Sequence, residues 1–246
     1  MAWTKMTERT PWPAQARPHA VYKKELLDRL RALSPASILD VGCGDGILLR
    51  SACEAGCVRC VGLEPDEQAA GSAQAAGLEV HVGRAENLPF PDRSFDIVAF
   101  EYVTHHLEHL QKSLLEAARV ADRAVLVLDC WYDEAFASQQ VARDYDEWSK
   151  RIDRRTGMVH NPCPAPPELA APFMALGGFE IDLSCRLVLR PVPIETMAVD
   201  AREQLSLVDD DPELRRELGE ILDRARRHGA TDDGAILMTA ERRGVD

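Results

Sequence analysis

A glycine-rich turn is the first place in this chain where binding chemistry is expected. Gly42, Gly44 and Gly46 directly follow an apolar run at residues 38–41, and residues 47–55 have the pattern of a helix. Because glycine has no Cβ, the backbone of such a turn can approach a ligand closely. The free N–H groups at the start of a helix favour an anionic group. The turn therefore predicts a site for a ligand that carries a carboxylate or a phosphate.

A pair of histidines is the second candidate for chemistry. His105 and His106 follow another apolar run, residues 95–100. Imidazole titrates near neutral pH, so either side chain could act as a general base, although one of them could instead be structural or face a cofactor. His109 lies about one helical turn further on and is expected to be exposed to solvent.

The elements that must position these residues alternate regularly along the chain. Apolar runs predict strands and periodic apolar residues predict helices. The predicted strands are 38–41, 58–64, 78–82, 95–100, 124–128, 179–189 and 235–241. The predicted helices are 20–33, 47–55, 66–76, 107–118, 137–152, a short helix before Gly177-Gly178, and 211–225. Strands that alternate with helices imply a parallel, doubly wound sheet.

Three motifs in this order resemble class I S-adenosylmethionine-dependent methyltransferases. They are Asp40-Val41-Gly42-Cys43-Gly44-Asp45-Gly46, the acidic Glu64 that ends the second strand, and the segment from Gly83 to Asp96. The resemblance covers roughly residues 36–130, and the third motif is similar to the small-molecule branch that includes quinone-biosynthesis methyltransferases. It implies an α/β, Rossmann-like, doubly wound and mostly parallel seven-stranded sheet, with helices on both faces and helical cap insertions. It also implies S-adenosylmethionine as cofactor and S-adenosylhomocysteine as product.

The resemblance assigns the cofactor contacts. Glu64 would bind both ribose hydroxyls, because a carboxylate offers acceptors for two donors. The cofactor-binding residues implied are Asp40, Gly42, Cys43, Gly44, Glu64, Pro65, Ala85, Glu86 and Glu101. Relatives usually have an aspartate, which accepts from the adenine amino group, where this chain has Arg84. Arginine cannot accept, so Glu86, a backbone carbonyl, or stacking together with the Ala85 amide would hold adenine.

Residues 101–109 resemble the family's segment beside the transferable methyl group. Methyl transfer is an in-line displacement, for which the protein must mainly align the nucleophile, and a base is needed only if that nucleophile starts protonated. His106 and His105 are the catalytic candidates. By their positions near strand ends, the substrate candidates are Tyr22, Tyr102, Trp131 and Tyr132. Trp3 and Trp12 lie in a terminal segment that could fold over the cofactor.

Composition narrows the partners and the location. The 246 residues carry a net charge of −12, which repels nucleic acid and anionic membranes. No apolar stretch approaches the roughly 18 residues of a membrane span, and the opening residues lack the apolar core of a secretory signal, so a cytoplasmic location is expected. The seven cysteines suit reduced thiols. Cys57 and Cys60 lack a second ligand pair, so no metal site is expected.

Two segments are expected along the chain. The pattern predicts that residues 1–35 form an N-terminal helical segment that could act as a lid, and the resemblance implies that 36–246 form the methyltransferase domain, with insertions expected at 131–165 and 190–233. An apolar stripe in the second insertion would pack in the core or form a homodimer face; its residues are Leu214, Leu218, Ile221, Leu222 and Ala225.

The function expected is methyl transfer to a small molecule, with three alternatives left open. The same fold could serve cyclisation or elimination, and it could belong to a non-catalytic partner subunit or an NAD-dependent dehydrogenase. Intact Gly42, Gly44 and Glu64 argue against the non-catalytic subunit. Ile47 argues against the dehydrogenase, because the dinucleotide fingerprint GxGxxG needs a glycine there.

Overall fold

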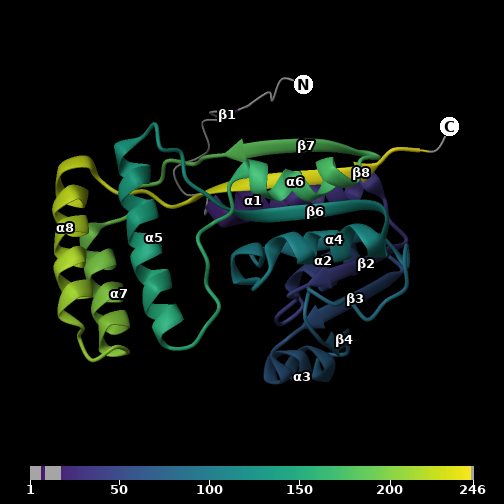
Figure 1. Cartoon of the computed structure of the whole chain (residues 1–246), viewed down its shortest axis with the longest axis horizontal. Helices are drawn as coiled ribbons and strands as arrows, with labels where there is room; N and C mark the ends of the chain where they lie inside the picture. Colours follow the sequence, from purple (N-terminus) through teal and green to yellow (C-terminus); the bar gives the residue numbers. More distant parts are fainter. Residues whose placement is uncertain (1–6, 9–17, 245–246) are drawn as a thin grey trace.

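A single mixed sheet forms the centre of the computed structural model, which describes residues 7–8 and 18–244 (Figure 1). Within these residues the sheet has eight strands in the order β1-β7-β8-β6-β5-β2-β3-β4. The strands are β1 (Thr7–Glu8), β2 (Ser37–Val41), β3 (Arg59–Glu64), β4 (Glu79–Val82), β5 (Phe95–Glu101), β6 (Ala121–Trp131), β7 (Phe179–Arg186) and β8 (Gly234–Arg242). Only β8 runs antiparallel to its neighbours. The predicted seven-stranded, mostly parallel sheet is confirmed, and the two-residue β1 extends it at one edge.

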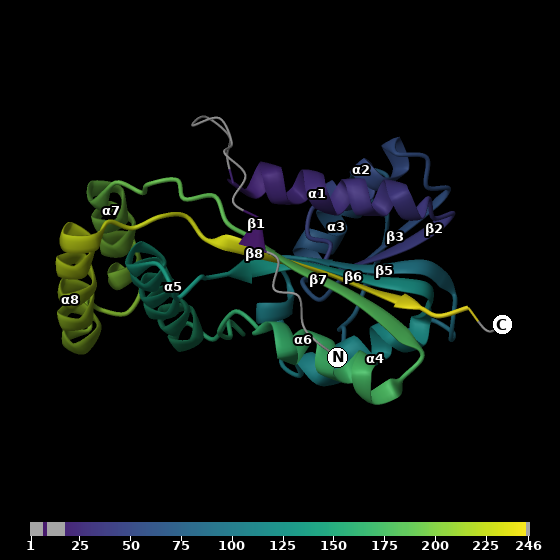
Figure 2. The same ribbon diagram turned by 90° about the horizontal axis from the view of Figure 1, so that it is seen from above.

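Helices cover both faces of the sheet, as predicted. The helices described are α1 (Pro18–Leu33), α2 (Ile47–Glu54), α3 (Glu67–Ala75), η1 (Thr104–His106, a 3₁₀ turn), α4 (Leu110–Val120), α5 (Ala137–Arg155), α6 (Pro166–Leu176), α7 (Ile194–Ser206) and α8 (Pro212–His228). Figure 2 shows α1, α2 and α3 on one face and α4 and α6 on the other. Leu26 of α1 and Leu48 of α2 belong to one buried cluster, and Leu114 of α4 and Phe173 of α6 belong to another. The core therefore has two layers, one on each side of the sheet.

Parallel pairing brings the chemical motifs to one edge. Val41 of β2 pairs with Leu63 of β3 on one side and with Phe100 of β5 on the other. The glycine turn, Glu64 and the histidine pair all follow these positions, so they meet at the carboxyl ends of the strands. Ligands of doubly wound sheets bind at this edge.

One strand and one helix have boundaries that differ from the predicted ones, and each difference has a physical reason. The strand predicted at 124–128 is the longer β6, because it pairs with β8 from Ala124 to Trp131 and with β5 from Ala121. The helix predicted from residue 107 begins at Leu110, because the preceding residues form the 3₁₀ turn η1.

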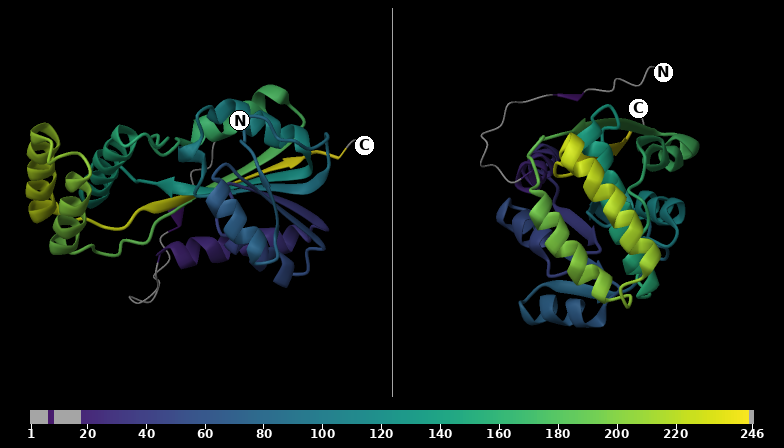
Figure 3. Two further views of the ribbon diagram at one scale, coloured as in Figure 1. Left: turned by 90° about the horizontal axis from the view of Figure 1, so that it is seen from below. Right: turned by 90° about the vertical axis from the view of Figure 1, so that its left-hand side faces the viewer.

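A helical cap formed by α5, α7 and α8 lies beyond the end of β6 (Figures 1 and 3). Val141 and Trp148 of α5, Met197 of α7, and Leu218 of α8 share one buried cluster. The indole N–H of Trp148 donates to the carbonyl of Leu214 at 2.8 Å. The apolar stripe of α8 therefore packs within the chain. Helix α7 was not predicted from the sequence.

One cysteine expectation is wrong. The expectation was that all seven thiols stay reduced, but Cys130 and Cys163 form a disulfide with Cα atoms 5.9 Å apart. Cys130 lies near the end of β6, and Cys163 lies in the loop between α5 and α6, which folds back over that end. Their contact arises from tertiary structure, because 33 positions separate them. None of the described helices is both long and apolar enough to cross a membrane.

Candidate functional site

The backbone of the glycine turn adopts conformations that favour glycine. Gly42 and Gly44 have φ angles of +72° and +52°, a region that favours glycine. A Cβ on Gly42 would lie 2.2 Å from Cγ2 of Val103, whereas a Cβ on Gly44 would have no atom within 4 Å. The amides of Gly42 and Cys43 donate to the carbonyl of Leu63 at 2.7 and 3.1 Å. The turn is thus fixed against β3, with open space beside Gly44.

Glu64, the last residue of β3, ties the turn to the start of α3. It is 9% exposed. One carboxylate oxygen accepts from the amide of Gly44 at 2.9 Å, and the other accepts from the amide of Asp66 at 3.1 Å. A carboxylate has about four lone-pair sites, so each oxygen can accept a further hydrogen bond from a ligand.

A pocket with a volume of about 570 Å³ lies at this edge. Among its lining residues are the predicted cofactor residues Gly42, Glu64, Pro65, Ala85 and Glu86. It is also lined by Val103, His106, Leu107, Met158 and Val159. The sequence did not single out Met158 and Val159, which come from the loop that follows α5.

The other predicted cofactor residues do not line this pocket. Cys43 packs against Gly62, where an added Cβ would lie 2.5 Å from its Sγ. The backbone N–H of Gly44 is used by Glu64, as described above. Asp40 is buried, and Glu101 forms an ion pair with Lys23 of α1, with Nζ 2.8 Å from Oε1. Lys23 is a site residue that the sequence did not indicate.

Asp40 is unusually placed for an acid. Burial, together with the nearby carboxylate of Glu101, raises its pKa to about 8, although Lys23 acts in the opposite direction. Asp40 is therefore largely protonated at neutral pH, and a neutral carboxyl can donate a hydrogen bond.

Arg84, the departure from the family pattern, turns toward acidic side chains. Its guanidinium lies 2.8 Å from Oε1 of Glu108 and 3.7 Å from Oε2 of Glu86. The other oxygen of Glu86 accepts from the amide of His109 at 3.2 Å. Glu86 and Ala85 remain the candidates for the adenine contact, because both line the pocket.

The two predicted catalytic histidines have different surroundings. Nδ1 of His105 lies 2.5 Å from a carboxylate oxygen of Asp129, which is fully buried at the end of β6. Nδ1 of His106 lies 2.9 Å from the carbonyl of Val159. A carbonyl can only accept, so Nδ1 of His106 carries the proton and Nε2 is the basic nitrogen of the neutral ring. Burial lowers the pKa of His106, which keeps the ring neutral at pH 7.

Asp129 stays charged because its partners compensate for its burial. Burial acts to raise its pKa, but the hydrogen bonds from His105 and Thr104 and the amide of Cys130 hold the pKa below its usual value. His109 is exposed, as predicted.

The predicted substrate residues divide into two groups. Trp131 and Tyr132 line a second pocket of about 470 Å³, together with Arg143, Glu147 and the 162–166 loop. Tyr22 is fully buried, and its hydroxyl accepts from the amide of Val188 at 2.9 Å and donates to the carbonyl of Asp233 at 3.3 Å. The structure thus places Tyr22 in the core.

Tyr102 belongs to neither of these two groups. Its φ of +55° is rare for a residue with a side chain, and its ring stacks on His19 with centroids 5.0 Å apart. Its buried hydroxyl has no hydrogen-bond partner among the described residues. Tyr102 lines neither of the two pockets described above. Trp3 and Trp12 lie outside the described residues.

The comparisons with known proteins agree with this geometry. The family described as "Methyltransferase domain" matches residues 39–127. The chain is 35% identical over 106 residues to the uncharacterized methyltransferase YcgJ of Bacillus subtilis, which covers 39% of this chain and 42% of that protein. It is 31% identical over 133 residues to ajmaline N-methyltransferase of Rauvolfia serpentina, and this match covers 50% of this chain and 45% of that protein. The chain spans less than half the length of these curated relatives.

Solved structures show the same fold over most of the chain. YcgJ from Bacillus subtilis superposes with a TM-score of 0.61 at 20% identity, covering 90% of this chain and all of that one. The [4+2]-cyclase SpnF superposes with a TM-score of 0.58 at 17% identity, and the match covers 96% of this chain and 86% of that chain.

The sheet order and the glycine turn define a Rossmann-like, ligand-binding α/β fold. Over residues 39–127 the chain is similar to class I S-adenosylmethionine-dependent methyltransferases, and S-adenosylmethionine is the cofactor of that class. The residues present fit this cofactor. Open space beside Gly44 admits a ligand at the helix N-terminus, and Glu64 keeps acceptor capacity at the wall of the pocket.

Proposed function

We propose that this protein transfers a methyl group from S-adenosylmethionine to a small-molecule acceptor by in-line displacement. The observation that carries the proposal is one pocket lined by both Glu64, which is tied to the glycine turn, and His106, whose neutral imidazole can act as a base. A carboxylate with free acceptor capacity and a neutral imidazole thus line the same space.

The residues of this chain have separable tasks in the proposed reaction. S-adenosylmethionine, when bound, supplies an electrophilic methyl group. Glu64 would accept hydrogen bonds from the ribose hydroxyls, and the open space beside Gly44 would admit the amino-acid part. His106 can remove a proton at Nε2 from an acceptor that starts protonated. The loop at Met158 and Val159 lines the same pocket and would help to exclude water.

The second pocket is the main reason for proposing a small-molecule acceptor. Its volume of about 470 Å³ is within the range of small-molecule sites, and Trp131 and Tyr132 give it aromatic walls. The net charge of −12 disfavours a nucleic-acid acceptor. Ajmaline N-methyltransferase is named for a small-molecule acceptor, whereas another relative, the ribosomal protein L11 methyltransferase of Neisseria gonorrhoeae, is named for a protein. A cytoplasmic location and a homodimer stay predictions.

Calorimetric titration with S-adenosylmethionine, S-adenosylhomocysteine and NADH tests the first step. Binding of the first two without a response to NADH is expected, and binding of NADH alone would overturn the proposal. Release of S-adenosylhomocysteine is then measured with a panel of metabolites and with a protein acceptor. Mass analysis of the product separates methylation from cyclisation or elimination, because only methylation adds a methyl group to the acceptor.

A further inference from the structure

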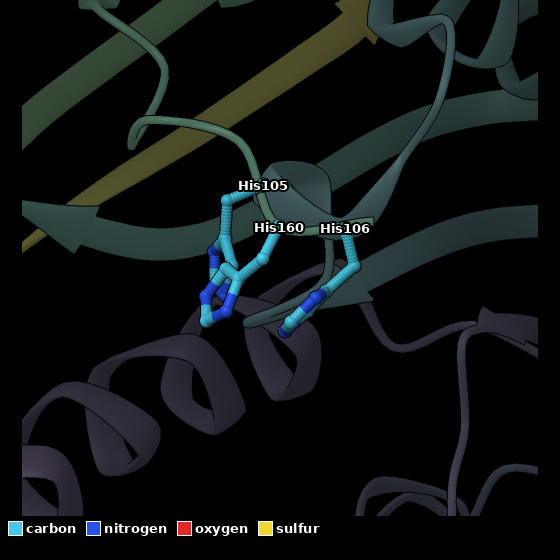
Figure 4. Close-up of side chains that lie close together, drawn as sticks. All are labelled: His105, His106 and His160. Atoms are coloured by element: carbon cyan, nitrogen blue, oxygen red, sulfur yellow. The ribbon is translucent and has the colours of Figure 1, made fainter. Parts of the chain in front are cut away.

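Three histidines from two distant segments converge beside the pocket. His105 and His106 belong to η1, and His160 belongs to the loop between α5 and α6 (Figure 4). One ring nitrogen from each lies within 4.8 Å of one from each of the others. The ring centroids of His106 lie 4.3 Å from those of both His105 and His160. Ring nitrogens this close together can become three ligands of one metal ion.

Each imidazole is held through Nδ1 by an acceptor outside the cluster. Nδ1 of His105 faces Asp129, and Nδ1 of His106 faces the carbonyl of Val159, as described above. Nδ1 of His160 lies 2.6 Å from a carboxylate oxygen of Asp153. Because carboxylates and carbonyls accept, Nδ1 carries the proton in all three rings. Within the described part of the chain, Nε2 of these rings has no hydrogen-bond partner and keeps its lone pair.

This pattern is the one that metal-binding histidines show. A ligating imidazole almost always donates its other N–H to a carboxylate or a backbone carbonyl, which fixes the tautomer and the ring orientation. A cluster of histidines that served only packing would not require all three rings to offer the same nitrogen. The backbone also fixes the cluster, since Asn161 donates from its amide to the carbonyl of His105 at 2.7 Å and from its side chain to that of Leu107 at 2.8 Å.

The charges around the cluster favour a divalent cation. Asp129 and Asp153 lie directly behind two of the rings and together can balance a 2+ charge. Lys150 acts in the opposite direction, but its Nζ is paired with Asp146 at 2.7 Å and contacts Cys163 Sγ at 2.9 Å.

We propose that His105, His106 and His160 bind one Zn²⁺ or a similar divalent transition-metal ion through Nε2. Three histidine ligands leave a fourth position open in a tetrahedral zinc site. The ion would lie beside the cofactor pocket, because His106 also lines that pocket. Metal binding does not depend on the proposed methyl transfer. The two proposals compete for one atom, because Nε2 of His106 cannot act as a free base while it binds a metal.

The test is metal titration of the full-length, metal-free protein. Co²⁺ is followed by its visible absorption, and Zn²⁺ is followed by calorimetry together with elemental analysis. We expect one ion per chain and a Tm that rises with added Zn²⁺. His160→Ala should weaken binding at least 100-fold, and Asp153→Asn should weaken it 10- to 100-fold, because it removes only the support of a ligand. His109→Ala is the matched control, since its exposed ring lies outside the cluster, and it should leave the affinity unchanged.

Several results would overturn the assignment. One is the absence of stoichiometric binding to the wild type, and another is equal affinity in folded His160→Ala protein. His105 also lies near Asp129 and Cys130 in an overlapping set of ligands. Cys130 can bind a metal only as a free thiolate, after reduction of its disulfide with Cys163. Binding that appears only in reduced protein, and that is lost in Cys130→Ser but not in His160→Ala, would move the ion to that set. His160→Gln, with its fold checked by circular dichroism, replaces His160→Ala if that variant does not fold. S-adenosylhomocysteine binding is measured in the same samples, so failure of the cofactor site is distinguished from failure of the metal site.

Discussion

At the scale of single residues, Glu64 has two tasks that share its two carboxylate oxygens. It accepts from the amides of Gly44 and Asp66, and in the proposed complex it also accepts from the ribose. Its buried position strengthens both kinds of hydrogen bond, because water does not compete for the carboxylate. In the proposed complex the residue would therefore couple the shape of the turn to the affinity for the cofactor.

Glu64→Ala should weaken S-adenosylhomocysteine binding by about 1–3 kcal/mol, through the loss of buried hydrogen bonds. Calorimetry measures the dissociation constant. Glu67→Ala, at an exposed position nearby on α3, is the control and should bind normally. An unchanged dissociation constant in Glu64→Ala would remove this carboxylate from the cofactor site.

Asp40 should make the stability of the protein depend on pH. Its pKa is raised to about 8 in the folded state by burial first and by Glu101 second, whereas an unfolded aspartate titrates near 3.9. The folded state therefore binds the proton more tightly, and stability from this group is lost as pH rises from about 4 to 8. Asp40→Asn removes the titration, so its Tm should exceed that of the wild type by a margin that grows over this range and levels off above it.

The control for Asp40→Asn is Asp45→Asn, whose side chain is 68% exposed on the same turn. Thermal unfolding followed by circular dichroism from pH 5 to 9 measures both variants. A constant difference in Tm between Asp40→Asn and the wild type would show that Asp40 does not titrate as its burial implies.

His106→Ala should slow methyl transfer by about 10²- to 10⁴-fold if the imidazole is the base, with S-adenosylhomocysteine binding retained. In the wild type, kcat/KM should be flat above neutral pH and should fall on acidification through a pKa below 6.5, because burial lowers the pKa of His106 and protonation removes the base. His109→Ala is expected to leave the profile unchanged. Equal turnover in His106→Ala would assign no base role to this ring.

At the scale of elements, the cap has its own apolar core. Helices α5, α7 and α8 bury Trp148, Met197 and Leu218 against one another. Most helical stability comes from packing of this kind and less from intrinsic propensity. The cap also helps to position the candidate site, because α5 contains Asp153 and leads into the loop that contains Val159 and His160.

Leu218→Ala should destabilise the protein by about 2–5 kcal/mol, because it leaves a cavity in the cap core. Urea unfolding measures the change in the free energy of unfolding. Leu207→Ala removes a side chain that is 63% exposed and should have little effect. If Leu218→Ala were as stable as Leu207→Ala, the packing of α8 against α5 would not contribute as described.

At the scale of the whole molecule, the disulfide joins the sheet to the loop that completes the site. Cys130 belongs to β6, and Cys163 follows His160 in the loop. The bond therefore restrains the loop that supplies one of the three histidines and part of the pocket wall.

The disulfide can be counted directly. Five free thiols are expected in the unfolded, oxidised protein and seven after reduction, by a colorimetric thiol assay. Closure of a loop across 33 positions should contribute roughly 3–4 kcal/mol, so Cys163→Ser should unfold at lower urea concentration than an oxidised wild type. Seven thiols before reduction would exclude the bond.

The sequence by itself determined the sheet, most of the helices and the binding edge. Apolar runs and periodic stripes are local signals, and parallel pairing then places Gly42 and Glu64 together, because strands of alternating α/β units end at the same edge. Helix α7 was missed although Met197, Ala201 and Leu205 are spaced as one helical face. They stand in a segment that was interpreted as an irregular insertion.

Only the tertiary structure decided which distant residues meet at that edge. His160 reaches His106 across 54 positions, Cys163 reaches Cys130 across 33, and Lys23 reaches Glu101 across 78. Periodicity reports the face of an element and carries no information on distances between separate elements. The histidine cluster and the disulfide depend on how the loop after α5 folds back, which is set by its hydrogen bonds to η1 and by the packing of the cap. These long-range contacts have no local pattern, so the sequence alone could not predict them.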